Sequence, residues 1–105
     1  MIVEMRTYKV KPGTRPKLLE ALKGKCFDEL KRIGVKVAGP YASTEDEVTI
    51  FWMRGFPDAA ARSAMSGAFY SGEAWKRELA DIFMPNLEKY DVVAVEMPES
   101  AVEWA

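Results

Sequence analysis

Hydrophobic and polar positions alternate at the start of the chain and then change to a helical spacing. Residues 2–10 (IVEMRTYKV) are rich in β-branched and aromatic side chains and contain neither Gly nor Pro, which predicts a strand. A Pro–Gly pair ends this strand, and Thr14 is expected to cap the helix that follows. From Thr14 to about Ile33 apolar residues recur every three or four positions, which predicts an amphipathic helix that stops at Gly34.

The second half of the chain returns to strands and then to helices. Residues 35–44 predict a weaker strand, in which Pro40 is expected at an edge or a bulge because it has no N–H for a ladder. An acidic turn leads into residues 48–54 (VTIFWMR), the most apolar predicted strand. Two helical segments follow, separated at Ser71–Gly72 and ended by a proline, and a last strand is predicted over residues 87–97.

The order of these elements, β-α-β-β-α-α-β, predicts a ferredoxin-like α+β sandwich. Its four-stranded antiparallel sheet has the expected spatial order fourth, first, third, second, so the first and third strands are central. We expect a single domain over residues 1–98. Residues 99–105 form an acidic tail, which is expected to be frayed, with docking of Val102 and Trp104 on the domain as the alternative.

The sheet has one face that the helices cannot cover. This face is apolar whichever way the strands are turned, since it carries one of two sets: Tyr8, Ile50 and Trp52, or Met5, Phe51 and Met53. Either set is too apolar to be left in water, so a second copy of the chain, forming a homodimer through the sheet faces, is the simplest cover. The pattern leaves open which face packs against the helices.

Composition narrows the function classes. The 105 residues carry a net charge of −1, which argues against nucleic-acid binding, and the absence of histidine excludes His-based triads and His-ligated haem or zinc. The single cysteine, Cys26, lies on the apolar stripe of the first helix and is expected to be a buried, unreactive thiol. We expect no cofactor, no metal and no membrane segment, and a cytoplasmic location.

Several motifs resemble those of one known family. They are Ile2-x-Glu4-x-Arg6-x-Tyr8 followed by Lys11-Pro12-Gly13, then Gly39-x-Tyr41, the strand with Trp52, Asp58-x-x-Ala61-Arg62, and Trp75. Together they resemble NIPSNAP family domains. The resemblance implies a dimeric α+β barrel with a small-molecule pocket in each protomer, and it implies no particular activity. Related dimeric barrels include cofactor-free monooxygenases and haem-degrading enzymes, several of which rely on a histidine.

The candidate chemistry lies on the first strand, where Glu4, Arg6 and Tyr8 share one face. Polar groups in the middle of a sheet need partners or a cavity. Because the first and third strands are expected to run antiparallel, Glu4 should lie near Arg54, and Trp52 should flank Arg6.

Such a cluster can act on a ligand in three ways. Arg6 or Arg54 can bind a carboxylate, and Trp52 can stack on an aromatic ring. Glu4 and Tyr8 are candidates for proton transfer, and Tyr41 is expected to face the cavity or the partner.

The same residues also fit a purely structural role. A satisfied Glu–Arg ladder often fixes strand register or a dimer contact, which would make the chain a non-enzymatic homodimeric interaction module. The residues leave open which of the two roles applies, which ligand is bound and whether any reaction is catalysed.

Overall fold

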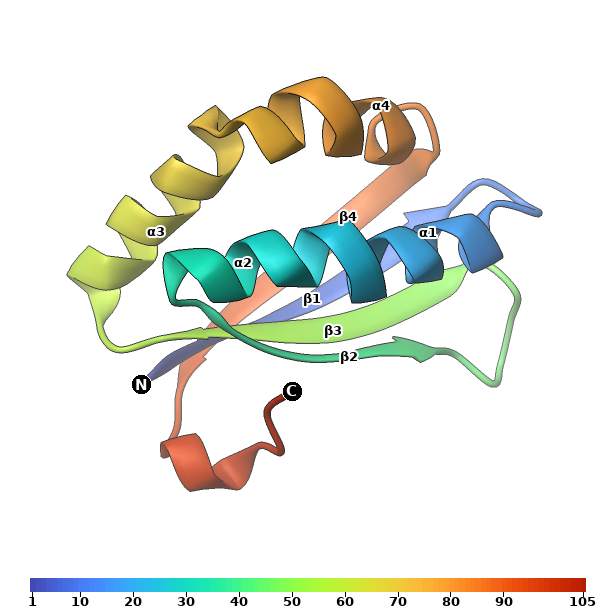
Figure 1. The fold of residues 1–105 in the computed structure, drawn as a ribbon. Helices are drawn as coiled ribbons and strands as arrows, with labels where there is room; N and C mark the ends of the chain where they lie inside the picture. The colour runs from blue at the N-terminus through green and yellow to red at the C-terminus, as the bar shows by residue number, and fades with distance from the viewer.

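An antiparallel sheet of four strands carries the main helices on one face and a short C-terminal turn on the other (Figure 1). The computed structural model describes all residues from 1 to 105. Its elements are β1 (Ile2–Val10), α1 (Arg15–Ala21), η1 (Leu22–Cys26), α2 (Phe27–Ile33), β2 (Lys36–Ala42), β3 (Thr49–Phe56), α3 (Ala59–Ser71), η2 (Trp75–Leu79), α4 (Ala80–Phe83), β4 (Leu87–Glu96) and η3 (Glu99–Ala101). The strand order is β2-β3-β1-β4, so the predicted ferredoxin-like α+β fold is confirmed. None of the helices combines the length and the apolar character that a membrane crossing needs.

The first helical segment runs from α1 through the π-helical turn η1 to α2, and it is kinked at Gly24, whose φ of −89° and ψ of −107° are not helical. Gly34 ends it with a positive φ of 107°, which a residue without Cβ adopts most easily. Thr14 occupies the N-cap position, but its side chain does not cap the helix. Its Oγ1 donates instead to the carbonyl of Lys11 at 2.6 Å and tightens the preceding turn. The predicted side-chain cap is therefore wrong, whereas the predicted helix is confirmed.

Strand β2 lies at the edge of the sheet, and its pairing with β3 shifts register between Ala38 and Tyr41. Pro40 lies inside this shift, so both expectations for it, an edge and a bulge, are met. The shift also sets the face of the sheet to which the Tyr41 side chain points. Tyr41 pairs with Phe51, and the two rings stack with their centroids 6.4 Å apart.

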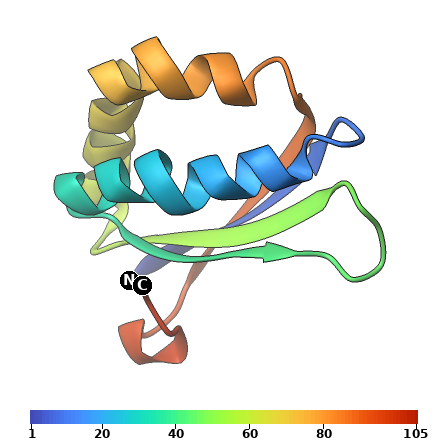
Figure 2. The same cartoon turned by 45° about the vertical axis from the view of Figure 1, so that its right-hand side comes forward.

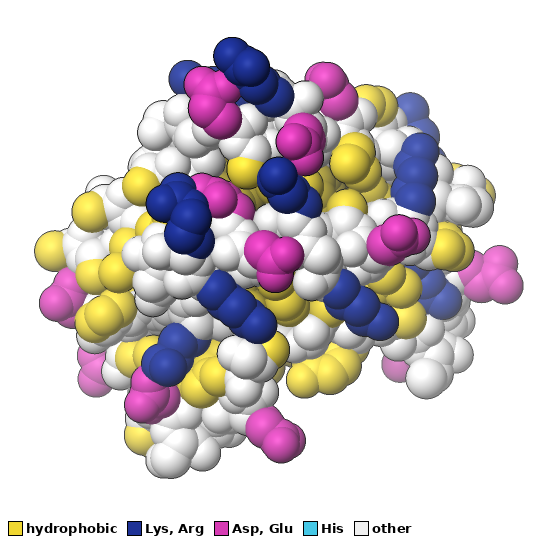
Figure 3. Space-filling model, viewed as in Figure 1, with side chains coloured by type: hydrophobic (Ala, Val, Ile, Leu, Met, Phe, Trp, Pro, Cys, Tyr) yellow, Lys and Arg dark blue, Asp and Glu magenta, His cyan; other side chains and the backbone are white.

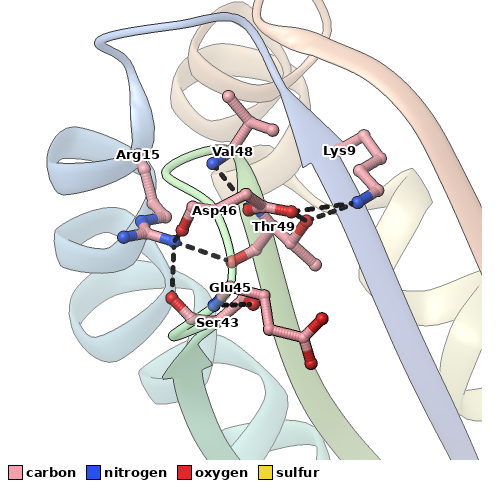
Figure 4. Close-up of polar contacts among 7 residues, drawn as sticks. All are labelled: Lys9, Arg15, Ser43, Glu45, Asp46, Val48 and Thr49. Atoms are coloured by element: carbon pink, nitrogen blue, oxygen red, sulfur yellow. Dashed lines mark hydrogen bonds and ion pairs between the residues drawn. The ribbon is translucent and has the colours of Figure 1, made fainter.

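The acidic turn between β2 and β3 is held by its own side chains (Figure 4). Asp46 accepts from the amides of Val48 and Thr49 and from the Thr49 hydroxyl. The Thr49 hydroxyl and the Val48 amide lower the pKa of Asp46 to about 2. Arg15 at the start of α1 donates to the carbonyls of Ser43, Asp46 and Thr49, which ties this turn to the helix layer.

The strand register shows which face of the sheet packs against the helices. Tyr8 pairs with Ile50 and Arg6 with Trp52, and Tyr8, Ile50 and Trp52 all belong to the core formed with the helices. The opposite face, here called the outer face, therefore carries Met5, Phe51 and Met53. Of the two sets that the sequence left open, the second is the one that the helices do not cover.

The C-terminal tail folds back onto the outer face, so the expectation of a frayed end is wrong. Figure 2 shows η3 on the side of the sheet opposite the helices. The Ala105 amide donates to the Val37 carbonyl at 2.9 Å, and Trp104 Nε1 donates to the Glu99 carbonyl at 3.0 Å. The Trp104 ring lies over Gly55, where the strand has no side chain to block it.

Replacing Gly55 with Ala is expected to displace the tail. The added Cβ would lie 2.8 Å from Trp104 Cη2, and the indole is the part that can move, so the sheet itself is expected to remain folded. The NMR signal of the Trp104 indole N–H measures this directly and should shift strongly. Gly67→Ala is the control, because a Cβ there meets nothing within 4 Å. An unchanged indole signal in Gly55→Ala would contradict the docked tail.

Candidate functional site

A single buried carboxylate lies at the centre of three arginines. Glu4 Oε1 accepts from Arg6 Nη1 at 2.7 Å and from Arg54 Nε at 2.5 Å, and Glu4 Oε2 accepts from Arg62 Nε at 2.7 Å. The predicted pairing of Glu4 with Arg54 across β1 and β3 is confirmed, as is the position of Trp52 beside Arg6. We call Glu4, Arg6, Arg54 and Arg62 the arginine cluster.

The arginine cluster carries more positive than negative charge. Glu4, Arg6 and Arg54 are the only buried charged residues, and the Arg62 side chain is 38% exposed. Basic and acidic side chains are mixed over the side of the molecule seen in Figure 3, so the excess is not part of a basic patch on that side. Three guanidinium groups therefore share one carboxylate inside the fold.

The arginines keep Glu4 ionised. Burial by itself raises the pKa of Glu4, but the charge of Arg54 and the hydrogen bonds from Arg62 and Arg54 outweigh it and hold the pKa below its ordinary value of 4.5. Burial likewise disfavours the charged form of Arg6, yet Tyr8, Tyr70 and Glu4 hold the pKa of Arg6 above its ordinary value. Glu4 is therefore an ionised counter-ion of the arginines, and an ionised carboxylate has no proton to donate.

Tyr8 lies beyond Arg6 on the same strand. Its hydroxyl accepts a long hydrogen bond of 3.4 Å from Arg6 Nε, and its ring packs edge-on against Trp52. Burial raises the pKa of Tyr8, so its hydroxyl stays protonated at neutral pH. Proton transfer by Glu4 or Tyr8 stays a prediction, and this geometry favours electrostatic and hydrogen-bonding roles for both.

A cavity of about 530 Å³ lies between the sheet and the helices, with the arginine cluster in its wall. The rest of the wall is mainly aromatic or apolar and comes from β1, β4, η1 and the helical segment from α3 to α4. Its large side chains are Tyr8, Tyr70, Trp75, Phe83 and Tyr90. Glu88 and Lys89 of β4 also line it. No three Asp, Glu or Cys side chains come together as a metal ion would need.

The aromatic wall is made of rings in mutual contact. The centroids of Tyr70 and Trp75 are 5.1 Å apart in an edge-to-face arrangement, and Trp75 stacks on Phe83 at 6.2 Å. Tyr70 also covers Arg54, whose Cζ lies 5.5 Å from the ring centroid. These contacts fix the ring positions, so the cavity is largely formed before any ligand enters.

Two predicted ligand residues lie elsewhere. Trp52 is beneath the arginine cluster rather than in the cavity wall, with the Cζ atoms of Arg6 and Arg54 at 5.4 and 5.9 Å from its ring. Tyr41 is on the outer face and 51% exposed, so of its two expected places the cavity is wrong, and contact with a partner stays a prediction. The cause is the register shift at Pro40, which turns Tyr41 outward with Phe51.

Cys26 lines the cavity but is not a reactive thiol. It is buried in the first helix, and this burial raises the pKa of Cys26 to about 12. The thiolate is therefore scarce at neutral pH, in agreement with the buried, unreactive thiol expected from the sequence.

Comparison with known proteins identifies the family. The family model described as NIPSNAP matches residues 3–92. The chain belongs to the NIPSNAP family. No curated protein matches the chain.

Solved NIPSNAP structures share this fold. An uncharacterised NIPSNAP domain protein from Burkholderia xenovorans is 20% identical with a TM-score of 0.79, covering 94% of this chain and 96% of that chain. A NIPSNAP family protein from Agrobacterium tumefaciens is 16% identical with a TM-score of 0.80, covering 93% of both chains. An antibiotic biosynthesis monooxygenase is 14% identical with a TM-score of 0.70, covering 93% of this chain and 99% of that chain. At sequence identities this low, the similarity to these three structures shows a shared fold only.

The functional residue that sequence reasoning missed is Arg62. It appeared only within the motif that resembles the NIPSNAP family, with no role attached. Its helix α3 begins at Ala59 and is capped by Asp58, whose side chain accepts from the Ala61 amide at 2.7 Å, and this start places Arg62 against Glu4. The motif itself was the available signal, since a capped helix start fixes which residue of the first turn faces the sheet.

Replacing Glu4 with Gln is expected to destabilise this NIPSNAP protein by about 3 kcal/mol at pH 7, because Arg6 and Arg54 lose their buried counter-charge. The folded-state pKa of Glu4 lies below its unfolded value. Its ionisation therefore stabilises the fold above about pH 4.5, and this contribution is lost as the pH falls through the folded pKa. Urea unfolding of both proteins between pH 7 and pH 3 measures both effects, and the difference between them should shrink in acid.

The control for this experiment is Glu29→Gln, which removes a carboxylate from the exposed pair with Arg32. Its effect on the free energy of unfolding should be much smaller, because solvent screens that pair. Equal losses in the two variants would contradict the central role of Glu4.

Proposed function

We propose that this NIPSNAP-family protein binds a small carboxylate with an aromatic or apolar body in the cavity between sheet and helices. The observation that carries the proposal is the excess of arginine charge beside an aromatic wall. A ligand carboxylate would offset this excess, and the rings would pack against its body.

Arginine N–H groups that have no hydrogen-bond partner in the chain support the proposal that the ligand carries a carboxylate. Arg54 and Arg62 donate within the chain only through Nε, and Arg6 donates only through Nε and Nη1. The remaining Nη groups make no hydrogen bond in the chain, and all three residues line the cavity. A guanidinium fork with free Nη groups suits a carboxylate, which accepts two parallel bonds.

The size and character of the cavity support a small organic ligand. Its volume of about 530 Å³ falls in the usual range for small-molecule sites, and most of its lining is hydrophobic. The alternative, in which the arginine cluster only holds the fold together, accounts less well for the charges. In the buried part of the structure two guanidiniums, those of Arg6 and Arg54, share the single carboxylate of Glu4, so the buried charges of this network do not balance.

We also propose that a second copy of the chain covers the outer face. Met5, Phe51 and Met53 form the middle of this face, and Val93 beside them on β4 is 57% exposed. The docked tail covers the end near Gly55, and it leaves Val93 exposed and Met5, Phe51 and Met53 half-buried. An apolar sheet face of this kind is typical of a protein interface, and two identical faces can pack on each other by two-fold symmetry.

Wild-type protein is expected to bind benzoate measurably more tightly than the uncharged benzamide, as measured by calorimetric titration. Arg6→Gln should weaken benzoate binding by about tenfold or more, because it removes one charged donor, and it should leave benzamide binding little changed. The fold should survive, since Glu4 keeps Arg54 and Arg62 as partners. Arg32→Gln makes the same change in net charge on the surface and should have no effect. Equal benzoate affinity in wild type and Arg6→Gln would overturn the proposed site.

For the interface, Val93→Glu is expected to convert a dimer into a monomer, because the new carboxylate would be buried without a partner. Light scattering after size-exclusion chromatography measures the mass, and the wild type should run at twice the chain mass of 11.8 kDa. Met84→Glu is the matched control, since Met84 is 64% exposed but lies in the helix layer. A monomeric wild type, or a dimeric Val93→Glu variant, would contradict this interface.

A further inference from the structure

A second hollow, of about 420 Å³, adjoins the arginine cluster on the side of α3. It shares Glu4, Arg54 and Arg62 with the cavity, and its other lining residues are Ala59, Ser63 and Ser66. These three residues of α3 recur at spacings of four and three, so they lie on one face of the helix. Their small side chains leave the space open, and no aromatic ring lines it.

The donors that line this hollow have no partners in the chain. Both Nη groups of Arg54 are unused, although Arg54 is only 3% exposed, and those of Arg62 are unused as well. Ser63 is exposed and Ser66 is half-buried, and no side chain of the chain occupies either hydroxyl. A buried guanidinium with free donors, next to a second guanidinium and two hydroxyls, forms a polar lining rich in donors.

We propose that this hollow binds a phosphate group, either as the free ion or as a monoester. A tetrahedral oxyanion has enough oxygens to accept from two guanidiniums and two hydroxyls at once, which a flat carboxylate cannot do as fully. Both oxygens of Glu4 are already hydrogen-bonded to arginines, so its charge is neutralised toward the hollow. The Ala61 amide at the start of α3 is already bonded to Asp58, so it is not a donor to this hollow.

This phosphate site differs from the proposed carboxylate site in the residues that can be changed to test it. Ser63 and Ser66 line only the hollow, whereas Arg6 and Tyr90 line only the cavity. Variants of the two groups therefore report on the two sites separately, although Arg54 and Arg62 belong to both.

The test is a titration of the full chain with inorganic phosphate and with phenyl phosphate at constant ionic strength, followed by the NMR signals of the arginine Nε–H groups. Wild-type protein should show saturable shifts at Arg54 and Arg62. The double variant Ser63→Ala/Ser66→Ala should bind about tenfold or more weakly while keeping its affinity for benzoate. It should fold normally, because alanine favours helix more than serine does. The more tightly bound of the two probes identifies whether the ion or the ester is the natural source.

The controls separate this proposal from the previous one. Ser71→Ala removes a hydroxyl from the same helix outside the hollow and should bind phosphate as wild type does. Arg6→Gln should lose benzoate affinity and keep phosphate affinity. Absence of saturable phosphate binding, or equal phosphate affinity in wild type and the double serine variant, would overturn the phosphate site. Phosphate binding without benzoate binding would support the phosphate site and would contradict only the carboxylate site.

Discussion

The fold depends on one buried carboxylate that joins three elements. Glu4 of β1 holds Arg54 of the neighbouring strand β3 and Arg62 of helix α3, and it also holds Arg6 of its own strand. These contacts fix the register of the two central strands and tie α3 to the sheet at the same point. Because buried charges are tolerated only with partners, neither strand can slip by a residue without leaving charges unpaired in the interior.

Much of this arrangement could be predicted because it follows from topology and strand periodicity. The βαββααβ order makes β1 and β3 antiparallel neighbours, and a period of two then places Glu4 opposite Arg54 and Arg6 opposite Trp52. The position of Arg62 beside Glu4 could not be predicted in the same way. Its contact with Glu4 depends on how α3 lies across the sheet, which is a matter of tertiary packing rather than of spacing along the chain.

The errors have equally local causes. Tyr41 was expected to face the cavity or the partner, and the register shift at Pro40, which reverses the alternation of side chains along β2, excludes the cavity. The tail was expected to fray because it is an acidic chain end, although Val102 and Trp104 were candidates for docking. Its docking depends on Gly55, which lies far away in sequence and leaves room for Trp104. The choice between the two sheet faces was open for a related reason: both carry large apolar side chains, so hydrophobicity alone does not distinguish them.

What distinguishes the two faces is the polar ladder of β1. Glu4 needs cationic partners because it is buried, and the helix layer of the same chain adds Arg62 to the two arginines of the sheet. The face that holds the buried charges is the face that the helices cover, and the face around Met5, Phe51 and Met53 is left outside. This division places the free guanidinium groups beside the cavity and the side chains of Met5, Phe51 and Met53 on the opposite side of the sheet. The proposed anion sites and the proposed interface with a second copy therefore lie on opposite faces of one sheet. The arginine cluster links the two, because the contact of Arg62 with Glu4 holds α3 on one face and leaves the other face without a helix over it.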